Sequence, residues 1–230
     1  MTSGTTQFLL AEPNWDNLGP TFLDAIGDTL WMVAITMVVG GLFGLILGML
    51  LYTTRPGGIL RNNVVYTLIN IAVNFFRPIP FIIMIAMLYP LTLEVVGTTI
   101  GRAAATFVMC FSATFTVARI VEQNLVAIDP GVIEAAKAMG ASPLKIIFSV
   151  IIPEALGPLI LGLTFMFIAI VDMSAMAGYI GAGGLGDFAI VYGYRSFNDA
   201  VTWTTVAVII VIVQIAQLGG NWLSKKIMRR

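Results

Sequence analysis

The chain has 230 residues, of which 58% are hydrophobic and only 10% charged, and its formal net charge is zero. A soluble domain is roughly half apolar and a quarter charged, so this composition indicates a membrane protein. The zero net charge gives no overall basic excess that would suggest nucleic acid, and the absence of histidine argues against common zinc sites and Ser-His catalysis. The single cysteine, Cys110, cannot form a disulfide within the chain.

Residues 1–28 precede the first long apolar segment and carry acidic side chains but no Lys or Arg. A secretory signal peptide begins with positive charge, so this segment does not fit one. We expect residues 1–28 to be an extracytoplasmic lead-in, acidic and amphipathic, that is retained in the mature chain.

Five apolar segments follow, and an α-helix needs about 20 such residues to cross a bilayer. They span residues 29–51, 64–91, 100–121, 148–180 and 201–223. Gly44 and Gly48 in the first segment form a small-xxx-small pair, which suits close helix contact. The second segment is interrupted at FRPIP (76–80) and is either one broken helix or two shorter elements. The predicted fold is all-α, a polytopic membrane protein with about five transmembrane helices in a transmembrane domain over residues 29–223.

The distribution of Lys and Arg predicts the orientation in the membrane, because cytoplasmic loops are enriched in both. The segment 224–230 carries four of these residues, and the two connections after the first and third spans carry Arg55, Arg61, Lys137 and Lys145. We therefore expect a multi-pass membrane protein. Its N-terminus would lie outside, and 224–230 would be a basic cytoplasmic tail.

A short cytoplasmic helix is predicted over residues 130–140. Asp129 suits the N-cap, Pro130 the first helical position and Gly140 a left-handed stop, and a new helix restarts at Pro143. One side of the helix is expected to comprise Val132, Ile133, Ala136 and Met139. So short a helix is not stable alone, so it packs either on the protein's own inner surface or on a cytosolic partner.

The same stretch resembles a known signature. EAA at 134–136, Gly140 after three further residues, and Pro153 at the end of VIIP (150–153) follow the EAA pattern of ABC-importer permeases. Val and Ile replace the usual Ile and Leu before the proline. In that family the signature forms the coupling helix, which seats in a cleft of the ATPase subunit. The resemblance implies that the ATPase-coupling residues are Glu134, Ala135, Ala136, Gly140 and Pro153.

A wider likeness points to one subfamily. The segments FFRPIPFII (75–83), ARIVEQNL (118–125), IEAAKAMGASPLKI (133–146) and SAMAGYIGAGGLGDFAIVYGY (174–194) together are similar to methionine-importer permeases. The likeness begins near Asp24 and implies the type I ABC importer permease fold. It also implies a homodimer in the lipid of the bacterial cytoplasmic membrane, two cytoplasmic ATPase subunits and an extracytoplasmic methionine-binding lipoprotein. The expected cargo is methionine, with D-methionine and derivatives as candidates.

The chain itself is expected to be a non-catalytic permease subunit that binds no cofactor and no metal. It contains no G-x-x-x-x-G-K-[ST] loop, so ATP-Mg would bind to the partner ATPase. One alternative is a permease for another amino acid or small solute. A stand-alone secondary transporter is a different class, and it would need ion-coupling residues of its own.

Charged residues within apolar segments predict a translocation pathway. A charge at membrane depth is costly and marks a functional site by default, and prolines break helices where a cavity is lined. Alternatively, Arg77 satisfies the carbonyl groups freed by the prolines, and Asp172 is an interfacial residue that reaches water. The predicted pathway residues are Arg77, Pro78, Pro80, Asp172, Ser174 and Met176.

Two further patterns have local explanations. GAGGLG (181–186) spells G-x-G-x-x-G, but it follows a membrane span rather than a strand and so does not predict a dinucleotide site. It is either a flexible turn or, by the resemblance, a loop that contacts the binding protein through Gly181, Gly183, Gly184 and Gly186. Arg119 and Glu122 lie one helical turn apart and are interpreted as a local ion pair or as interface charges.

Overall fold

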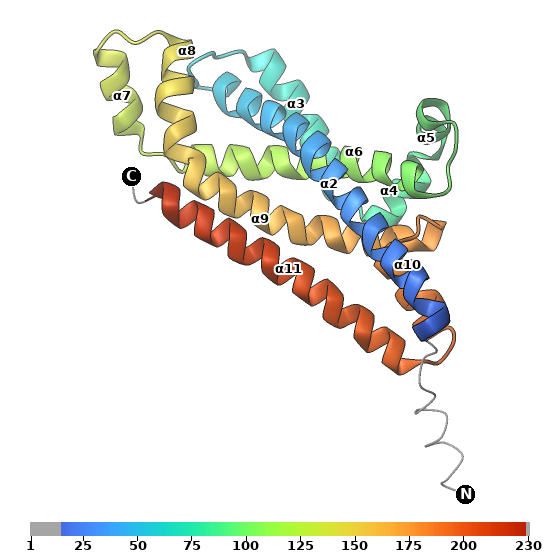
Figure 1. Cartoon of the computed structure of the whole chain (residues 1–230). Coiled ribbons are helices and arrows are strands. Elements are labelled where there is room, and N and C mark those ends of the chain that lie inside the picture. The colour runs from blue at the N-terminus through green and yellow to red at the C-terminus, as the bar shows by residue number, and fades with distance from the viewer. Residues whose placement is uncertain (1–14, 229–230) are drawn as a thin grey trace, which may run out of the picture. The chain divides into compact units, whose positions relative to one another are not determined.

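The computed structural model describes residues 15–228, and the regular structure within them is helical (Figure 1). The first half of this range contains the helices α2 (Trp15–Thr54), α3 (Asn63–Phe76), α4 (Phe81–Met87), α5 (Tyr89–Val96) and α6 (Arg102–Val126). The second half contains α7 (Pro130–Ala138), α8 (Pro143–Ile146), α9 (Ile152–Ala177), α10 (Gly184–Phe188) and α11 (Asp199–Met228). Short 3₁₀ and π turns join the helices between α8 and α11.

Four helical segments, over residues 15–54, 102–126, 143–180 and 199–228, are long and apolar enough to cross a membrane. A fifth is the pair α3 and α4, which is bent by 109° at the break between Phe76 and Phe81. The prediction of about five spans is confirmed as four to five candidate spans, and the second apolar segment is broken into two helices. The break follows from Pro78 and Pro80, because proline provides no backbone N–H for the helix.

Helix α2 begins at Trp15, well before the expected span start at Thr29. Hydropathy predicts which residues lie in the membrane and not where a helix begins, so it does not predict the polar first turns of this helix. Residues 1–14 of the expected lead-in and Arg229 and Arg230 of the expected tail lie outside the described residues.

The described chain divides into two compact units. The first comprises residues up to Met37, Pro80–Cys110 and Phe167–Ile215, and the second comprises Val38–Ile79, Phe111–Met166 and the chain from Ala216. Each of the long helices α2, α6, α9 and α11 therefore contributes residues to both units.

The core of the first unit is formed by Ala25, Leu185, Phe188 and Val201. The buried hydroxyl of Thr29 accepts a hydrogen bond from the backbone N–H of Leu185 at 2.8 Å, which fixes the start of α10 against α2. Asp28 also forms an ion pair of 2.5 Å with Arg102 at the start of α6.

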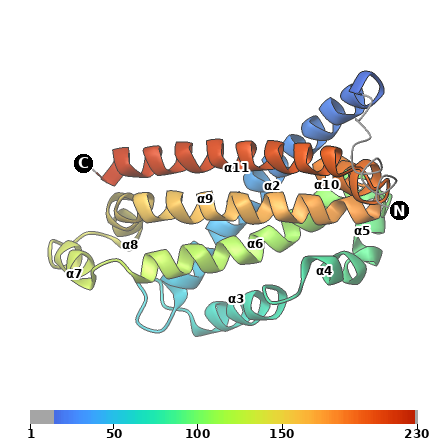
Figure 2. The ribbon, with the colours of Figure 1, turned by 90° about the horizontal axis from the view of Figure 1, so that it is seen from below.

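The core of the second unit is formed by Leu51, Val73 and Ala118. Gly44 and Gly48 permit α2 to approach α6, because a Cβ at Gly44 would lie 2.5 Å from Val117 and one at Gly48 would lie 2.5 Å from the carbonyl oxygen of Ala118. The predicted role of this small-residue pair in close helix contact is confirmed. In the same unit, α7 lies beyond the end of α6 (Figure 2).

Candidate functional site

Helix α7 is delimited by the residues that the sequence indicated. The side chain of Asp129 accepts a hydrogen bond of 2.8 Å from the backbone N–H of Gly131, and Pro130 is the first helical residue. Gly140 has a φ of +76°, and the N–H of Ala141 donates to the carbonyl of Ala136 at 3.1 Å. This is the pattern of a Schellman end, in which a left-handed residue allows the last carbonyl groups to be satisfied. The predicted cap, start and stop of the helix are confirmed.

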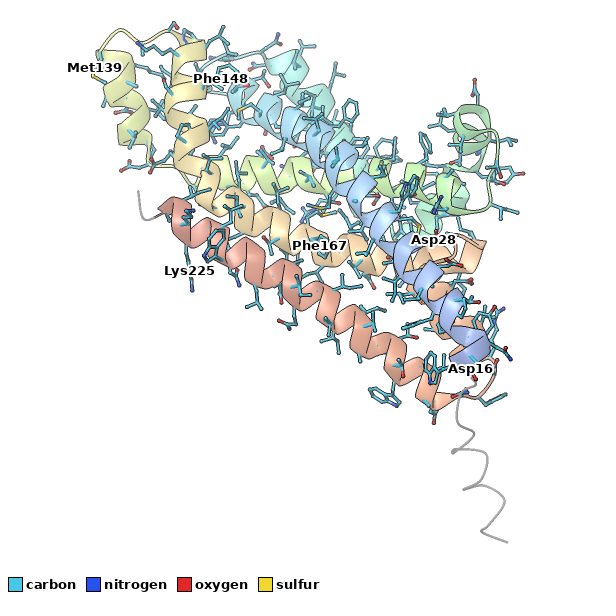
Figure 3. All side chains as sticks on the ribbon, in the orientation of Figure 1. Asp16, Asp28, Met139, Phe148, Phe167 and Lys225 are labelled. Atoms are coloured by element: carbon cyan, nitrogen blue, oxygen red, sulfur yellow. The ribbon has the colours of Figure 1, made fainter. Side chains whose placement is uncertain are left out.

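The apolar side of α7 differs from the prediction. Ile133 and Ala136 are buried in the second unit, whereas Val132 is 39% exposed and Met139 81% exposed. Only the residues that face the chain's own loop and helices are buried, so two of the four residues on the predicted apolar side, Val132 and Met139, stay exposed. Met139 projects at the end of the helix (Figure 3).

The five predicted coupling residues are thus divided by exposure. Glu134, Ala135, Gly140 and Pro153 are exposed, whereas Ala136 is 4% exposed and packs within its own chain. Direct contact of Ala136 with a partner is therefore a prediction that the structure corrects. Its small side chain allows α7 to pack closely on its own subunit.

A small cleft of about 150 Å³ lies between α7 and the loop after α2. Arg55, Glu134 and Lys137 line it, and the guanidinium of Arg55 lies 4.3 Å above the ring centre of Tyr52. Within residues 15–228, none of these three charged side chains has an ion-pair partner. The cleft therefore presents unpaired charge at the surface beside α7.

Pro153 follows a π turn, Ile147–Ile151, that joins α8 to α9. The N–H of Ile152 donates to the carbonyl of Ile147, five residues back. Proline at the next position has no N–H and would clash with a carbonyl in a regular α-helix. We infer that the wider turn accommodates this ring, so Pro153 sets the path of the chain between α8 and α9.

Arg77 and Pro78 lie in the break after α3 and, with Asn74, line a hollow of about 450 Å³ in the second unit. Arg77 is exposed, and in the described part of the chain its guanidinium has no hydrogen-bond or ion-pair partner. The interpretation that Arg77 satisfies carbonyl groups freed by the prolines is therefore wrong. Pro80 is the N-cap of α4.

Next to this hollow is a polar network that joins α3 to α6. Arg119 forms an ion pair with Glu122, as expected, and also donates to the side-chain oxygens of Asn70 at 2.9 Å and Asn74 at 2.5 Å. Glu122 is only 7% exposed. Sequence reasoning missed the two asparagines, although their spacing of four residues places them on one face of α3.

The predicted pathway residues of α9 do not share one environment. Asp172 and Met176 are exposed one helical turn apart, but Ser174 is 2% exposed and donates to the carbonyl of Val171 at 2.7 Å. Ser174 therefore does not face a pathway, which corrects that prediction. Its hydroxyl is satisfied by its own helix, so burying it costs little.

The GAGGLG segment is largely a packing element. Gly184 and Gly186 are buried, and a Cβ at Gly186 would collide with the backbone of Ala175. These two glycines therefore do not form an exposed contact, which corrects the prediction for them. Gly181 is exposed and Gly183 is partly exposed. Nearby, burial raises the pKa of Asp187, and the charge of Arg195 partly offsets this effect.

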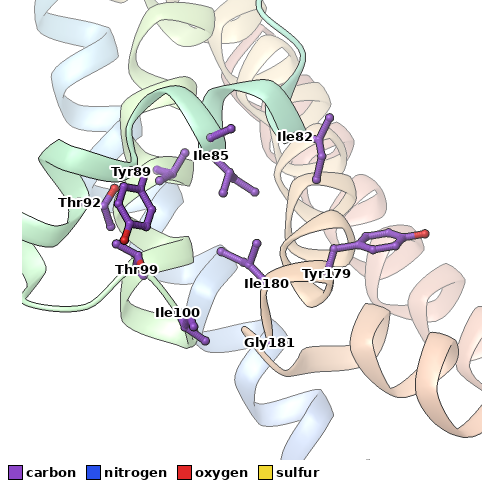
Figure 4. Close-up of a pocket in the computed structure, with 12 residues that line it drawn as sticks. Ile82, Ile85, Tyr89, Thr92, Thr99, Ile100, Tyr179, Ile180 and Gly181 are labelled. Atoms are coloured by element: carbon purple, nitrogen blue, oxygen red, sulfur yellow. The ribbon is translucent and has the colours of Figure 1, made fainter.

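The first unit also contains an apolar cavity of about 680 Å³, bordered by α4, α5, α6 and the turn after α9 (Figure 4). Its lining includes Ile82, Tyr89, Ile100, Tyr179 and the hydroxyl of Thr92, which is buried and has no hydrogen-bond partner within residues 15–228. Among residues 15–228, no charged side chain lines this cavity. It therefore offers hydroxyl groups but no charged partner for the ammonium or the carboxylate of a free amino acid.

Comparison with known families matches residues 40–229 to the binding-protein-dependent transport system inner membrane component. The chain belongs to this family. The family resemblance inferred from the EAA pattern is confirmed, and so are a multi-pass inner-membrane location and, over residues 15–228, the all-α permease fold.

Individual relatives of the chain support the same family membership. The probable D-methionine transport system permease protein MetI of Vibrio cholerae is 40% identical over 208 residues, covering 90% of this chain and 92% of that protein. The methionine import system permease protein MetP of Bacillus subtilis is 43% identical over 181 residues, covering 79% and 82%. A solved structure of the inward-facing MetNI methionine ABC transporter matches with a TM-score of 0.88 at 38% identity, covering 92% of this chain and 98% of that one.

Proposed function

We propose that this chain is the transmembrane permease subunit of an ATP-driven importer of methionine. The observation that carries the proposal is the likeness to the MetNI permease over 92% of the chain at 38% identity. Two copies would form one pathway and assemble with two ATPase subunits on the cytoplasmic side, which bind ATP-Mg. An extracytoplasmic binding protein would deliver the cargo.

In this proposal α7 is the coupling helix. Its exposed residues Glu134, Ala135 and Met139 would seat in the ATPase subunit, and the Schellman end at Gly140 would fix where the helix stops. Closure of the ATPases on ATP would draw the two coupling helices together and open the pathway outward. Pro153 would set how this movement reaches α9.

The translocation pathway and the contact with the binding protein are each proposed to involve fewer residues than the sequence suggested. Arg77, Pro78 and Pro80 at the helix break and Asp172 and Met176 on α9 would line the path of the cargo. Of the glycine segment, the exposed Gly181 and the partly exposed Gly183 would meet the binding protein.

Uptake of radiolabelled L-methionine in a strain that lacks its own methionine importers tests the function. Expression of this chain with its ATPase and binding protein should restore uptake, and unlabelled D-methionine and derivatives should compete if they share the pathway. No restored uptake, or competition only by an unrelated solute, would replace methionine with another cargo.

Native mass spectrometry of the purified complex tests the assembly. Two copies of this chain with two ATPase subunits are expected. A complex with a single copy of this chain would contradict the homodimer, and a chain that copurifies with no ATPase would favour a stand-alone transporter.

A further inference from the structure

The hollow lined by Asn74, Arg77 and Pro78 lies at the break of the second span, in the second unit. Its volume of about 450 Å³ is within the range of small-molecule sites. Helix α3 starts at Asn63, so a rise of 1.5 Å per residue places Arg77 roughly 20 Å along the span. A guanidinium at such a depth is costly unless it faces water or an anionic group.

The network beside the hollow fixes the orientation of Asn74. Arg119 is a donor only, so the side-chain oxygen of Asn74 must face it, and this bond measures 2.5 Å. The amide nitrogen of Asn74 is thereby turned the other way and uses one of its two N–H groups to donate to Asn70 at 3.2 Å.

The groups at the hollow that remain free to bind a ligand are hydrogen-bond donors. The Glu122 carboxylate and the side-chain oxygens of Asn70 and Asn74 all accept hydrogen bonds from Arg119. The second N–H of Asn74 and the guanidinium of Arg77 have no partner within residues 15–228. Since Arg119 and Glu122 neutralise each other, the charge of Arg77 is the uncompensated one at the hollow.

We propose that this hollow binds the carboxylate of the amino acid that is transported. Arg77 supplies a planar fork of donors that matches a carboxylate, and Asn74, held by Arg119, adds one further donor. The proposal rests on the proposed function and deepens it by assigning the group of the cargo that the permease recognises. The same chemistry would suit the phosphate of a lipid headgroup, so the experiment must distinguish the two sources.

The test uses the permease–ATPase complex in nanodiscs without the binding protein, because the binding protein would impose its own selectivity. A single cysteine replaces Pro78 in a Cys110→Ser background, and its rate of modification by a neutral maleimide is measured. L-Methionine should slow the reaction, whereas methioninol, which has an alcohol in place of the carboxylate, should not. A Leu156→Cys probe, in an apolar groove of the same unit, should be unaffected by either compound.

Arg77→Gln should raise the methionine concentration for half-protection by about tenfold or more, the effect of losing a hydrogen bond to a charged group. Arg77→Lys should raise this concentration less, because lysine keeps the positive charge although it lacks the paired N–H donors of the guanidinium. Arg61→Gln, at an exposed arginine of the first loop, should leave protection unchanged. Since the Arg77 side chain has no partner in the described chain, its variants should fold, and this is checked by copurification of the ATPase.

Three results would overturn the proposal: equal protection by methionine and methioninol, protection that persists in Arg77→Gln, or protection by added phosphatidylglycerol instead of methionine. Methionine uptake is measured in parallel on the same purified complex after reconstitution into proteoliposomes, with the binding protein present. Uptake without protection contradicts only the carboxylate site, whereas absence of uptake contradicts the proposed function itself.

Discussion

Gly140 adopts a φ of +76° at the end of α7, and the position that a Cβ would occupy is open. Replacing this glycine is therefore costly through the backbone alone, by about 1–2 kcal/mol for most residues. We expect Gly140→Val to displace the end of α7 and to lose most transport at near-normal membrane levels. Gly140→Asn should retain more, because Asn tolerates this conformation. Uptake and immunoblots of the membrane fraction measure both, and equal uptake by wild type and the Val variant would refute a docking role for this end.

Glu134 is exposed on α7 and has no ion-pair partner among residues 15–228. Glu134→Lys reverses its charge without disturbing the packing of Ile133 or Ala136. We expect this variant to reach the membrane and to bind or stimulate the ATPase poorly. Gln123→Lys, exposed on α6, is the matched control and should behave as wild type. Wild-type transport by Glu134→Lys would leave α7 as a surface connector.

At the residue scale, the sequence predicted conformation better than exposure. The cap at Asp129 and the left-handed Gly140 are local preferences, and the structure contains both. Ala136, Gly184 and Gly186 were expected to meet partners, yet they are buried in their own chain. A small side chain suits close approach to any neighbour, so its identity does not tell which neighbour it has.

At the scale of elements, the Arg119 network holds α3 against α6. Arg119→Leu leaves the buried Glu122 carboxylate unpaired, which typically costs about 3–5 kcal/mol. We expect a large drop in the thermal midpoint of the purified protein. The double variant Arg119→Leu/Glu122→Leu should recover much of it, because no buried charge then remains. Thermal unfolding in detergent measures this, and a double variant that unfolds at a lower temperature than the single one would contradict the interpretation.

The elements themselves were partly predictable. The five apolar segments and the break at FRPIP follow from composition and from the prolines, which act locally. The ion pair of Arg119 and Glu122 follows from helical spacing, but Asn70 and Asn74 are 49 and 45 residues away from Arg119, so only the folded chain brings them together. The π turn before Pro153 could not be predicted from residue propensities either, because it depends on how α8 and α9 are joined in the folded chain.

At the scale of the whole molecule, we predict that the two ends of the chain lie on opposite sides of the membrane. Single cysteines at Asp16 and Lys225, both exposed, are placed in a Cys110→Ser background. Lys225 is chosen instead of the neighbouring Ser224, because Ser224 is buried and its hydroxyl donates to the carbonyl of Gly157 at 2.9 Å. An impermeant maleimide applied to intact cells should label position 16 and not position 225. Equal labelling would contradict an odd number of spans.

The central claim is that this chain forms the membrane path of an importer driven by a separate ATPase. The most direct measurement is accumulation of labelled methionine in proteoliposomes that contain the purified complex, with the binding protein on the side opposite the ATPases. We predict accumulation against a gradient that requires ATP and is abolished when the ATPase subunits are left out. Accumulation by this chain alone, driven by an ion gradient without ATP, would contradict the claim.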